Sequence, residues 1–334
     1  MKRKITLLIS VFILSFCAVY AQNVMKLGVI GLDTSHSPAF IKFLNVNPKP
    51  EFSGFKVVAA YPHGSKTIKS SYERIPKYTE EAISYGVEIT SSIAELLDKV
   101  DGVFLETNDG NLHLEQAAEI FKAGKIVFID KPVGANLPQT IAIYKLAKQY
   151  NVPMFSSSSL RYSEKNQDLR AGKYGKVMGA DCYSPSTNEP SHANLYWYGI
   201  HGVEALFTIM GVGCNSVSCT SNEGTDVAVG LWNDGRMGSF RGIRDGSYNY
   251  GGSVFCEKKI EIAGPSAGYE GLLSVILSFF KTREIPIPEN ETLEIYTFME
   301  AANESNRQGG KQISMTAVYN KATKEADKLI KQLK

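Results

Sequence analysis

The stretch "NLHLEQAAEIFKAGKIVFIDKP", residues 111–132, indicates the fold most clearly. Its first part predicts a helix over residues 112–123, capped by Asn111 and ending before Gly124. The apolar face of this helix consists of Leu114, Ala117, Ala118 and Phe121. The β-branched and aromatic run at residues 125–129 then predicts a buried strand, and a helix leading into a strand is typical of an α/β protein.

The same alternation continues on both sides of this stretch. Further strands are predicted at residues 26–30, 56–60, 102–106 and 152–156. Further helices are predicted from Pro38 onward and at residues 77–85, 92–99 and 138–150. This order predicts a Rossmann-type, doubly wound parallel sheet over residues 24–155.

The pattern changes after residue 155, where strands follow one another directly between residues 214 and 262. The segment "GLWNDGRMGSF", residues 230–240, carries the Asp-Gly signal of an antiparallel hairpin. We therefore expect an α+β domain over residues 156–315 with a large, mostly antiparallel sheet, followed by a C-terminal helix at residues 316–334. Because such a sheet often leaves one face to cover, a homo-oligomer through this sheet is possible.

The first 21 residues have the pattern of a secretory signal peptide. Basic residues precede an apolar run from Ile5 to Ala18, and Val19 and Ala21 are the small residues before a cleavage site. The run is shorter than the roughly 20 residues that span a bilayer, so we expect no stable membrane span in the mature chain. Export to the periplasm or medium with cleavage after Ala21 is expected; a lipoprotein variant would use Cys17.

Composition excludes several classes of protein. With 334 residues, 43% hydrophobic and 21% charged, the chain can form two domains with real cores. Loss of the signal peptide would change the formal net charge from +2 to −1, which gives no basic surface for nucleic acid. No CxxC spacing predicts a metal site, and four cysteines are expected to be buried free thiols: Cys182, Cys214, Cys219 and Cys256.

The first strand leads into "GVIGLDTSHS", residues 28–37, which departs from a dinucleotide fingerprint. Only Gly31 is kept, while Asp33 and His36 stand where the pattern has a glycine and a glycine or alanine. A carboxylate there would lie beside the pyrophosphate and repel it. Alternatively, Asp33, Thr34 and Ser35 could satisfy the loop amides themselves, with a structural role for Asp33 and His36.

The chain resembles a known enzyme family in three places. Residues 113–132, "HLEQAAEIFKAGKIVFIDKP", resemble the Gfo/Idh/MocA family, whose hallmark is H-x-x-x-A, then A-G-K, then Glu-Lys-Pro; Asp130 is a mild departure. "VPMFSSSSLRYS" and "YGIHGVEALFTIMG" extend the resemblance over nearly the whole mature chain. The second segment is similar to the family's D-x-G-x-H-x-x-D helix, with Trp197, Gly199, His201 and Glu204 at the four positions.

The resemblance implies hydride transfer between NAD or NADP and a carbon of a sugar, polyol or sugar derivative. Lys131 and His201 would handle the hydroxyl proton. Because the aspartate position is Trp197, Glu204 or Tyr198 would have to orient His201. Implied cofactor contacts are Gly31, Asp33, Thr34, Ser35, His36, Thr107, Asn108, His113, Asp130 and Lys131. Residues that could face the substrate are Arg161, Tyr162, Trp197, Tyr198 and Glu204.

Two other functions remain open at the level of sequence. A non-catalytic carbohydrate-binding or scaffold protein could have kept the fold and lost dinucleotide binding, as the altered residues 31–36 would suggest. A hydrolase or lyase that uses bound NAD catalytically on glycosides would instead need a firmly held cofactor. The residues after the second strand include no acid for a ribose, and Ser65 or Lys66 could face a 2′-phosphate, so NAD and NADP stay equal alternatives.

Overall fold

The computed structural model describes residues 24–333, so the expected signal peptide lies outside the described residues. The N-terminal part forms a six-stranded parallel sheet in the order β3-β2-β1-β4-β5-β6. This is the Rossmann order, and it reverses between β1 and β4. The strands are β1 Met25–Ile30, β2 Phe55–Tyr61, β3 Glu88–Ile89, β4 Gly102–Leu105, β5 Ile126–Ile129 and β6 Met154–Phe155.

Helices cover both faces of this sheet. Apolar side chains of α4, α5 and α6 pack on one face, and those of α1 and α3 pack on the other. The fold class predicted from the alternation of strands and helices is therefore confirmed. The helices are α1 His36–Asn45, α2 Lys69–Tyr72, α3 Ile75–Ser84, α4 Ile93–Leu97, α5 His113–Lys122 and α6 Leu137–Gln149, with a 3-10 turn at Pro50–Phe52.

The C-terminal part forms a seven-stranded sheet in the order β12-β11-β7-β10-β9-β8-β13. Within this second sheet, β7–β10 is the one parallel pair among the described strands, and the expected hairpin joins β9 to β10 through Gly235 at φ +84°. The strands are β7 Val177–Pro185, β8 Cys214–Ser221, β9 Thr225–Trp232, β10 Met237–Ile243, β11 Gly251–Cys256, β12 Ile260–Ile262 and β13 Ile313–Ser314. The helical elements are a 3-10 turn at Ser159–Tyr162, α7 Glu164–Arg170, α8 Ile200–Met210, α9 Glu270–Thr282, α10 Glu289–Arg307 and α11 Met315–Gln332.

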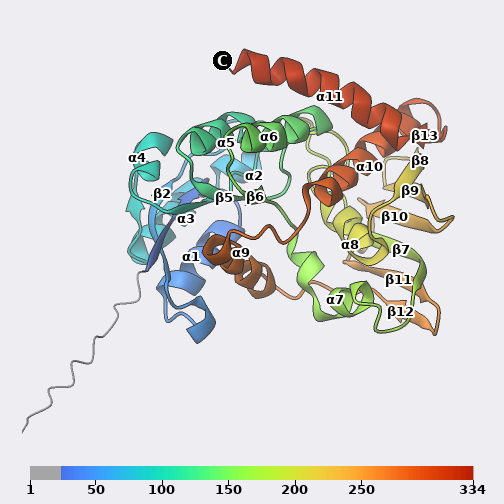
Figure 1. Cartoon of the computed structure of the whole chain (residues 1–334), viewed down its shortest axis with the longest axis horizontal. Coiled ribbons are helices and arrows are strands. Elements are labelled where there is room, and N and C mark those ends of the chain that lie inside the picture. Colours follow the sequence, from blue (N-terminus) through green and yellow to red (C-terminus); the bar gives the residue numbers. More distant parts are fainter. Residues whose placement is uncertain (1–23, 334) are drawn as a thin grey trace, which may run out of the picture.

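Two C-terminal helices pack against the N-terminal part (Figure 1). Helix α9 contributes to the core on the α1 face of the first sheet, where Phe279 contacts Phe155 at a centroid distance of 4.9 Å and Phe280 contacts Phe104 at 5.2 Å. Helix α11 lies along α6 on the outside of the molecule and extends from the second sheet toward the first. The two parts therefore share extensive apolar contacts.

Three sequence-based expectations can be compared with local structure. Asn111 does not cap α5, because its side chain instead donates to Asp109 and to the Ser191 carbonyl, and Leu112 occupies the cap position. Helix α1 begins at His36, two residues before the expected start, while Ser37 donates to the Gly31 carbonyl. The four cysteines are free and buried, as predicted. Within residues 24–333, no helix has the length and hydrophobicity needed to cross a membrane.

Candidate active site

A cavity of about 630 Å³ lies between the two parts of the protein, at the carboxyl ends of β1, β4 and β5. This is the position at which doubly wound sheets bind ligands, because the strand order reverses there. The first sheet contributes Thr34, Ser35, His36, Asn108, Asp130 and Lys131 to its lining. The second part contributes aromatic side chains, among them Trp197, Tyr198 and Tyr250.

Lys131 follows the end of β5 and lines this cavity. Its ammonium nitrogen lies 5.9 Å from the centroid of the Tyr198 ring, so the aromatic face stabilises the cation at this side of the cavity. The peptide bond between Lys131 and Pro132 is cis. A lysine in this place can donate a proton or a hydrogen bond to an oxygen of a bound molecule.

His201 lies in the first turn of α8, behind the aromatic wall of the cavity. Its ring centroid is 6.0 Å from those of Tyr198 and Tyr250, and its Nδ1 forms a 2.7 Å hydrogen bond with Ser158 Oγ. Burial, followed by the nearby side chains of Lys131 and His36, holds the pKa of His201 well below its usual value. The imidazole is therefore neutral near pH 7 and can accept a proton.

Glu204 acts on His201 only indirectly. Its carboxylate accepts hydrogen bonds from Ser157 Oγ (2.6 Å), the Ser158 amide (2.8 Å) and Arg161 Nε (2.8 Å). The expectation that Glu204 or Tyr198 orients the imidazole is wrong, because the hydroxyl of Ser158 contacts Nδ1 and Glu204 holds Ser158. The lost aspartate of the D-x-G-x-H-x-x-D pattern is thus replaced by a serine from another segment.

Arg161 belongs to the same buried network and does not line the cavity. Its guanidinium bridges Glu204 and Glu291, with Nη1 2.6 Å from Glu291 Oε1. Although burial alone would lower it, these two carboxylates raise the pKa of Arg161 above its ordinary value. The structure therefore places Arg161 and Glu204 in an internal ion-pair network and gives neither of them a direct path to a substrate.

The aromatic candidates divide into two groups. Trp197 and Tyr198 line the cavity, and the Trp197 ring also packs on His192 at a centroid distance of 4.9 Å. Tyr162 does not line the cavity and packs instead against the core beneath α9. Only the first two can contact a molecule in the cavity, and an aromatic ring suits the apolar face of a sugar.

The loop after β1 places Asp33 differently from the expectation. Its carboxylate is fully buried and accepts hydrogen bonds from Ser71 Oγ and, at 3.1 Å, from the Asn108 amide. It points toward Gly64, where an added Cβ would lie 1.9 Å from Oδ2. The carboxylate therefore does not lie beside the phosphates of a dinucleotide, and the expected repulsion at this position is wrong.

The start of α1 remains suited to a pyrophosphate. No side chain caps the amides of its first turn, and Thr34 and Ser35 line the cavity just before it. Such amides bind phosphate oxygens through hydrogen bonds and the helix dipole. Arg74 also lines the cavity and adds a positive charge. These residues fit a dinucleotide whose pyrophosphate lies at α1 and whose nicotinamide faces Lys131.

Three of the expected cofactor contacts lie behind the cavity wall. Gly31 has φ +90°, and a Cβ there would meet the backbone of Thr107 at 2.5 Å, so this glycine permits the close approach of two loops. His113 is fully buried, and its ring nitrogens contact the carbonyl oxygens of Thr107 (2.7 Å) and Val133 (3.2 Å). Gly31, Thr107 and His113 therefore shape the loops that line the cavity.

Glu106 was not singled out by sequence reasoning. It follows β4 directly and is fully buried beside His36 and Asp130. Burial and the neighbouring Asp130 raise the pKa of Glu106 well above its usual value. Although burial alone would raise it, His36 and Lys131 lower the pKa of Asp130 to about 2. An acid at the end of each of two adjacent strands was the signal that could have revealed this group.

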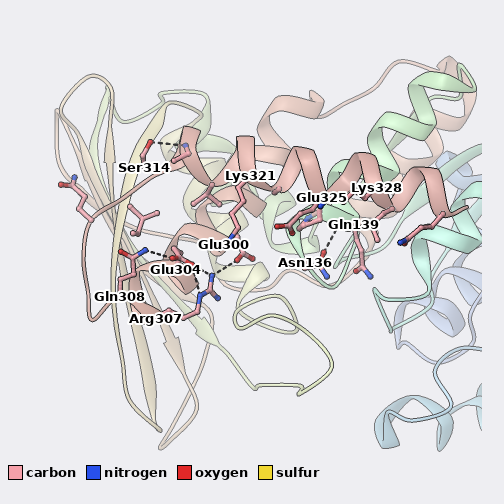
Figure 2. A pocket seen from close by; sticks show the side chains of 18 residues that line it. Asn136, Gln139, Glu300, Glu304, Arg307, Gln308, Ser314, Lys321, Glu325 and Lys328 are labelled. Atoms are coloured by element: carbon pink, nitrogen blue, oxygen red, sulfur yellow. Dashed lines mark hydrogen bonds and ion pairs between the residues drawn. The ribbon is translucent and has the colours of Figure 1, made fainter.

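A larger groove of about 770 Å³ runs between α10, α11 and the start of α6 (Figure 2). The labelled side chains are mostly charged, and Arg307 contacts both Glu300 (3.2 Å) and Glu304 (2.6 Å). None of the groove's polar atoms belongs to the buried, unpartnered groups of the described chain. We therefore place the functional site in the smaller cavity.

This arrangement defines a class of protein, namely a Rossmann-type protein with its site between the nucleotide-binding sheet and a second, mostly antiparallel sheet. Residues 25–157 match the model of the GFO_IDH_MocA family, described as "Oxidoreductase family, NAD-binding Rossmann fold". This match covers the N-terminal part of the chain. The resemblance seen in the sequence is thereby confirmed.

The individual proteins that resemble this chain share less than 30% of its sequence over the matched residues. "Myo-inositol dehydrogenase Hyg17" of Streptomyces leeuwenhoekii is 27% identical over 121 residues, which are 35% of this chain and only 37% of that protein. A probable dehydrogenase from Thermotoga maritima has a similar structure, with a TM-score of 0.71, 18% identity, and coverage of 88% of this chain and 100% of the other. Scyllo-inositol dehydrogenase from Lactobacillus casei, solved with NAD(H) and scyllo-inositol, is also similar in structure. Its TM-score is 0.69 at 14% identity, and the match covers 88% of this chain and 99% of the other.

Proposed function

We propose that this protein is an NAD(P)-dependent oxidoreductase that transfers hydride to or from a carbon bearing a hydroxyl group in a sugar, polyol or sugar derivative. The observation that carries this proposal is the position of Lys131, which lines the cavity at the sheet's carboxyl edge opposite Tyr198. The family match and the inositol dehydrogenases among the similar proteins support the reaction type and the substrate class.

The residues of the chain have separate tasks in this proposal. The amides of α1, with Thr34, Ser35 and Arg74, would hold the pyrophosphate, and the bound nicotinamide would supply the hydride acceptor. Lys131 would hydrogen-bond the reacting hydroxyl. The neutral imidazole of His201 would take up its proton, since Nδ1 is engaged by Ser158 and Nε2 has no hydrogen-bond partner among the described residues.

The test begins with the cofactor. The purified protein is denatured and examined for released nicotinamide dinucleotide, and the native protein is titrated with NAD and NADP by calorimetry. Reduction of the cofactor is then followed with a panel of inositols, hexoses and sugar acids. We expect binding of one dinucleotide and turnover with at least one polyol. No retained cofactor and no binding of either dinucleotide at millimolar concentration would contradict the proposal.

The same experiment separates the two alternatives. Binding of sugars without any dinucleotide would support a non-catalytic carbohydrate-binding protein. Release of a free sugar from a glycoside, with retained NAD and no net reduction, would support an NAD-assisted hydrolase. The first turn of α1 favours the oxidoreductase over the first alternative. Its backbone amides have no side-chain cap beside the cavity, and a bound pyrophosphate would accept hydrogen bonds from them.

We also propose that the protein is exported and forms homo-oligomers. Residues 1–21 support export through their basic start, apolar run and small residues before the cleavage site. Mass spectrometry of the protein from its native cells should give an N-terminus at Gln22, and an N-terminus at Met1 would contradict export. Exposed apolar side chains on the second sheet support oligomers, which light scattering would detect: Met178, Val229, Met237 and Phe255.

A further inference from the structure

Three side chains at or directly behind the inner wall of the cavity have no task in the proposed hydride transfer. His36 begins α1, Glu106 follows β4 and Asp130 follows β5, so the topology brings them to adjacent positions at one edge of the sheet. His36 Nδ1 lies 3.1 Å from Asp130 Oδ1 and 3.7 Å from Glu106 Oε2. One nitrogen or oxygen atom from each side chain lies within 4.8 Å of the other two.

These groups are deeply buried and lack hydrogen-bond partners. Glu106 and Asp130 are fully buried, and His36 is 5% exposed. Both oxygens of Glu106, both oxygens of Asp130 and Nδ1 of His36 have no hydrogen-bond partner among residues 24–333. Buried polar atoms in proteins are nearly always hydrogen-bonded, and buried carboxylates are paired or bind metal ions. His36 Nδ1 lies close to one unpartnered oxygen of each carboxylate, and a shared cation would satisfy this group.

We propose that His36, Glu106 and Asp130 bind one divalent transition metal ion, such as Zn²⁺ or Mn²⁺. One imidazole nitrogen and two carboxylates suit such ions better than Ca²⁺ or Mg²⁺, which prefer oxygen alone. Ligand atoms about 2.1 Å from a tetrahedral ion are roughly 3.4 Å apart, close to the two distances measured here.

The surroundings hold the ligands in place and leave one side open. The His36 ring packs between Phe40 and Tyr269, at centroid distances of 5.5 Å and 4.4 Å, and Tyr269 also bonds to Ser35 through its hydroxyl. Glu106 lies behind the wall, whereas His36 and Asp130 line the cavity. Free coordination positions would therefore face the cavity, where water or an oxygen of a bound molecule could occupy them.

This inference goes beyond the proposed oxidoreductase activity and does not depend on it. The sequence offered no metal-ligand spacing, because the three residues are 24 or more positions apart and come together only at the strand ends. The ions themselves serve as probes. Protein stripped with a chelator is titrated with Zn²⁺ and Mn²⁺ by equilibrium dialysis, and with Co²⁺ by visible absorption, which reports the ligand field directly.

We expect one ion per chain with a micromolar or lower Kd, a Co²⁺ absorption band, and a rise of several degrees in Tm with Zn²⁺. Glu106→Gln, which keeps the size of the side chain and removes its charge, should weaken binding at least tenfold and abolish the band. Asp109→Asn is the matched control: Asp109 is a buried carboxylate in the same loop that accepts from the Asn111 amide. It should leave the Kd within twofold of wild type.

The proposal is overturned by three results. The first is wild-type protein that binds neither Zn²⁺ nor Mn²⁺ below millimolar concentration, in which case the three groups share protons only. The second is equal affinity in wild type and Glu106→Gln, which would place the ion elsewhere. The third applies if Glu106→Gln does not fold: an absent Co²⁺ band in the wild-type protein then decides against the site. None of these results bears on whether the protein binds a dinucleotide.

Discussion

The backbone amide of Asn108 donates a hydrogen bond to the Asp33 carboxylate at 3.1 Å, and this contact joins the loop after β1 to the loop after β4. Ser71 Oγ donates to the other oxygen of the same carboxylate. Asp33 stands where the dinucleotide pattern has a glycine, and its carboxylate contacts other residues of the protein. The loop keeps its shape through its own side chains.

Burial raises the pKa of Asp33 to about 6, which makes the stability of the protein depend on pH. Between about pH 4 and pH 6 the folded protein holds a proton that the unfolded chain has lost. The contribution of Asp33 to stability is therefore greatest below pH 4 and falls as the pH rises through 6, by about 3 kcal/mol in all. Urea unfolding of wild type and Asp33→Asn at pH 4.5 and 7 should show a larger decline in the wild type than in the variant.

Asp33→Gly provides a second test of the same loop. Because the carboxylate points away from the cavity, its removal should not tighten dinucleotide binding, and the lost contacts to Asn108 and Ser71 should lower the free energy of unfolding by about 1 to 3 kcal/mol at pH 5. Calorimetric titration with NAD measures the first effect. A clear gain in affinity would show that the carboxylate does face the phosphates.

Arg161→Met should destabilise the protein strongly, because it leaves the carboxylates of Glu204 and Glu291 buried without their shared cation. Breaking a buried ion pair from one side costs about 3 to 5 kcal/mol. Lys49 and Glu270 form an ion pair that is about half exposed, and Glu270→Gln is the control, with an expected loss below about 1 kcal/mol. Equal losses in urea unfolding would contradict the network.

Lys131→Met should lower kcat by about 100-fold or more, since it removes the hydrogen bond to the reacting oxygen, and loss of one such donor costs about 10² to 10³ in kcat. The Kd for the dinucleotide should change less than tenfold, because the pyrophosphate is held at α1. Lys131→Arg keeps the charge but places its N–H donors on a larger, planar group, so it should remain slow. The exposed Lys122→Met is the control. If kcat of Lys131→Met equals that of the wild type, Lys131 takes no part in the reaction.

Ser158→Ala tests the positioning of His201. Loss of the hydroxyl should lower kcat/KM about tenfold by freeing the ring. Burial is the main reason for the lowered pKa of His201, so neither protein should lose activity through protonation of this ring between pH 8 and pH 6. Pre-steady-state and pH-rate measurements provide the readout. If kcat/KM falls below pH 7 in Ser158→Ala but not in the wild type, then Ser158, and not burial, keeps the pKa of His201 low.

Thiol labelling tests burial and export together. All four cysteines of the described chain are free and buried, so a thiol reagent should label them slowly in the native protein. After unfolding, four thiols should react if the signal peptide with Cys17 has been removed, and five if it remains. Rapid labelling of the native protein would contradict the packing of the second sheet.

The local pattern of the sequence predicted much of the fold because it reflects burial. The strand predicted at residues 26–30 is β1, Met25–Ile30, and the helix predicted at residues 138–150 is α6, Leu137–Gln149. The strand is a short run buried along most of its length, and the helix follows the capping residue Asn136. The Asp-Gly turn likewise fixed the hairpin of β9 and β10, since few other dipeptides adopt its backbone angles.

Contacts between distant segments were not predictable in this way. Glu106 gains its significance only from His36 and Asp130, and the partner of His201 is a serine 43 positions earlier. Asp33 looked like a misplaced charge because its hydrogen-bond donors, the Ser71 hydroxyl and the Asn108 amide, come from distant segments of the chain. The direction of a side chain at a strand end depends on which neighbour fills the space beside it.

The position of α9 has a consequence for biosynthesis. Phe104 and Phe155 belong to the first half of the chain, yet Phe280 and Phe279 cover them from residues 270–282. While the chain leaves the ribosome, the nucleotide-binding sheet therefore exposes an apolar face until more than a hundred further residues have been made. A fragment that stops after β6 lacks α9 and therefore leaves Phe104 and Phe155 without this cover.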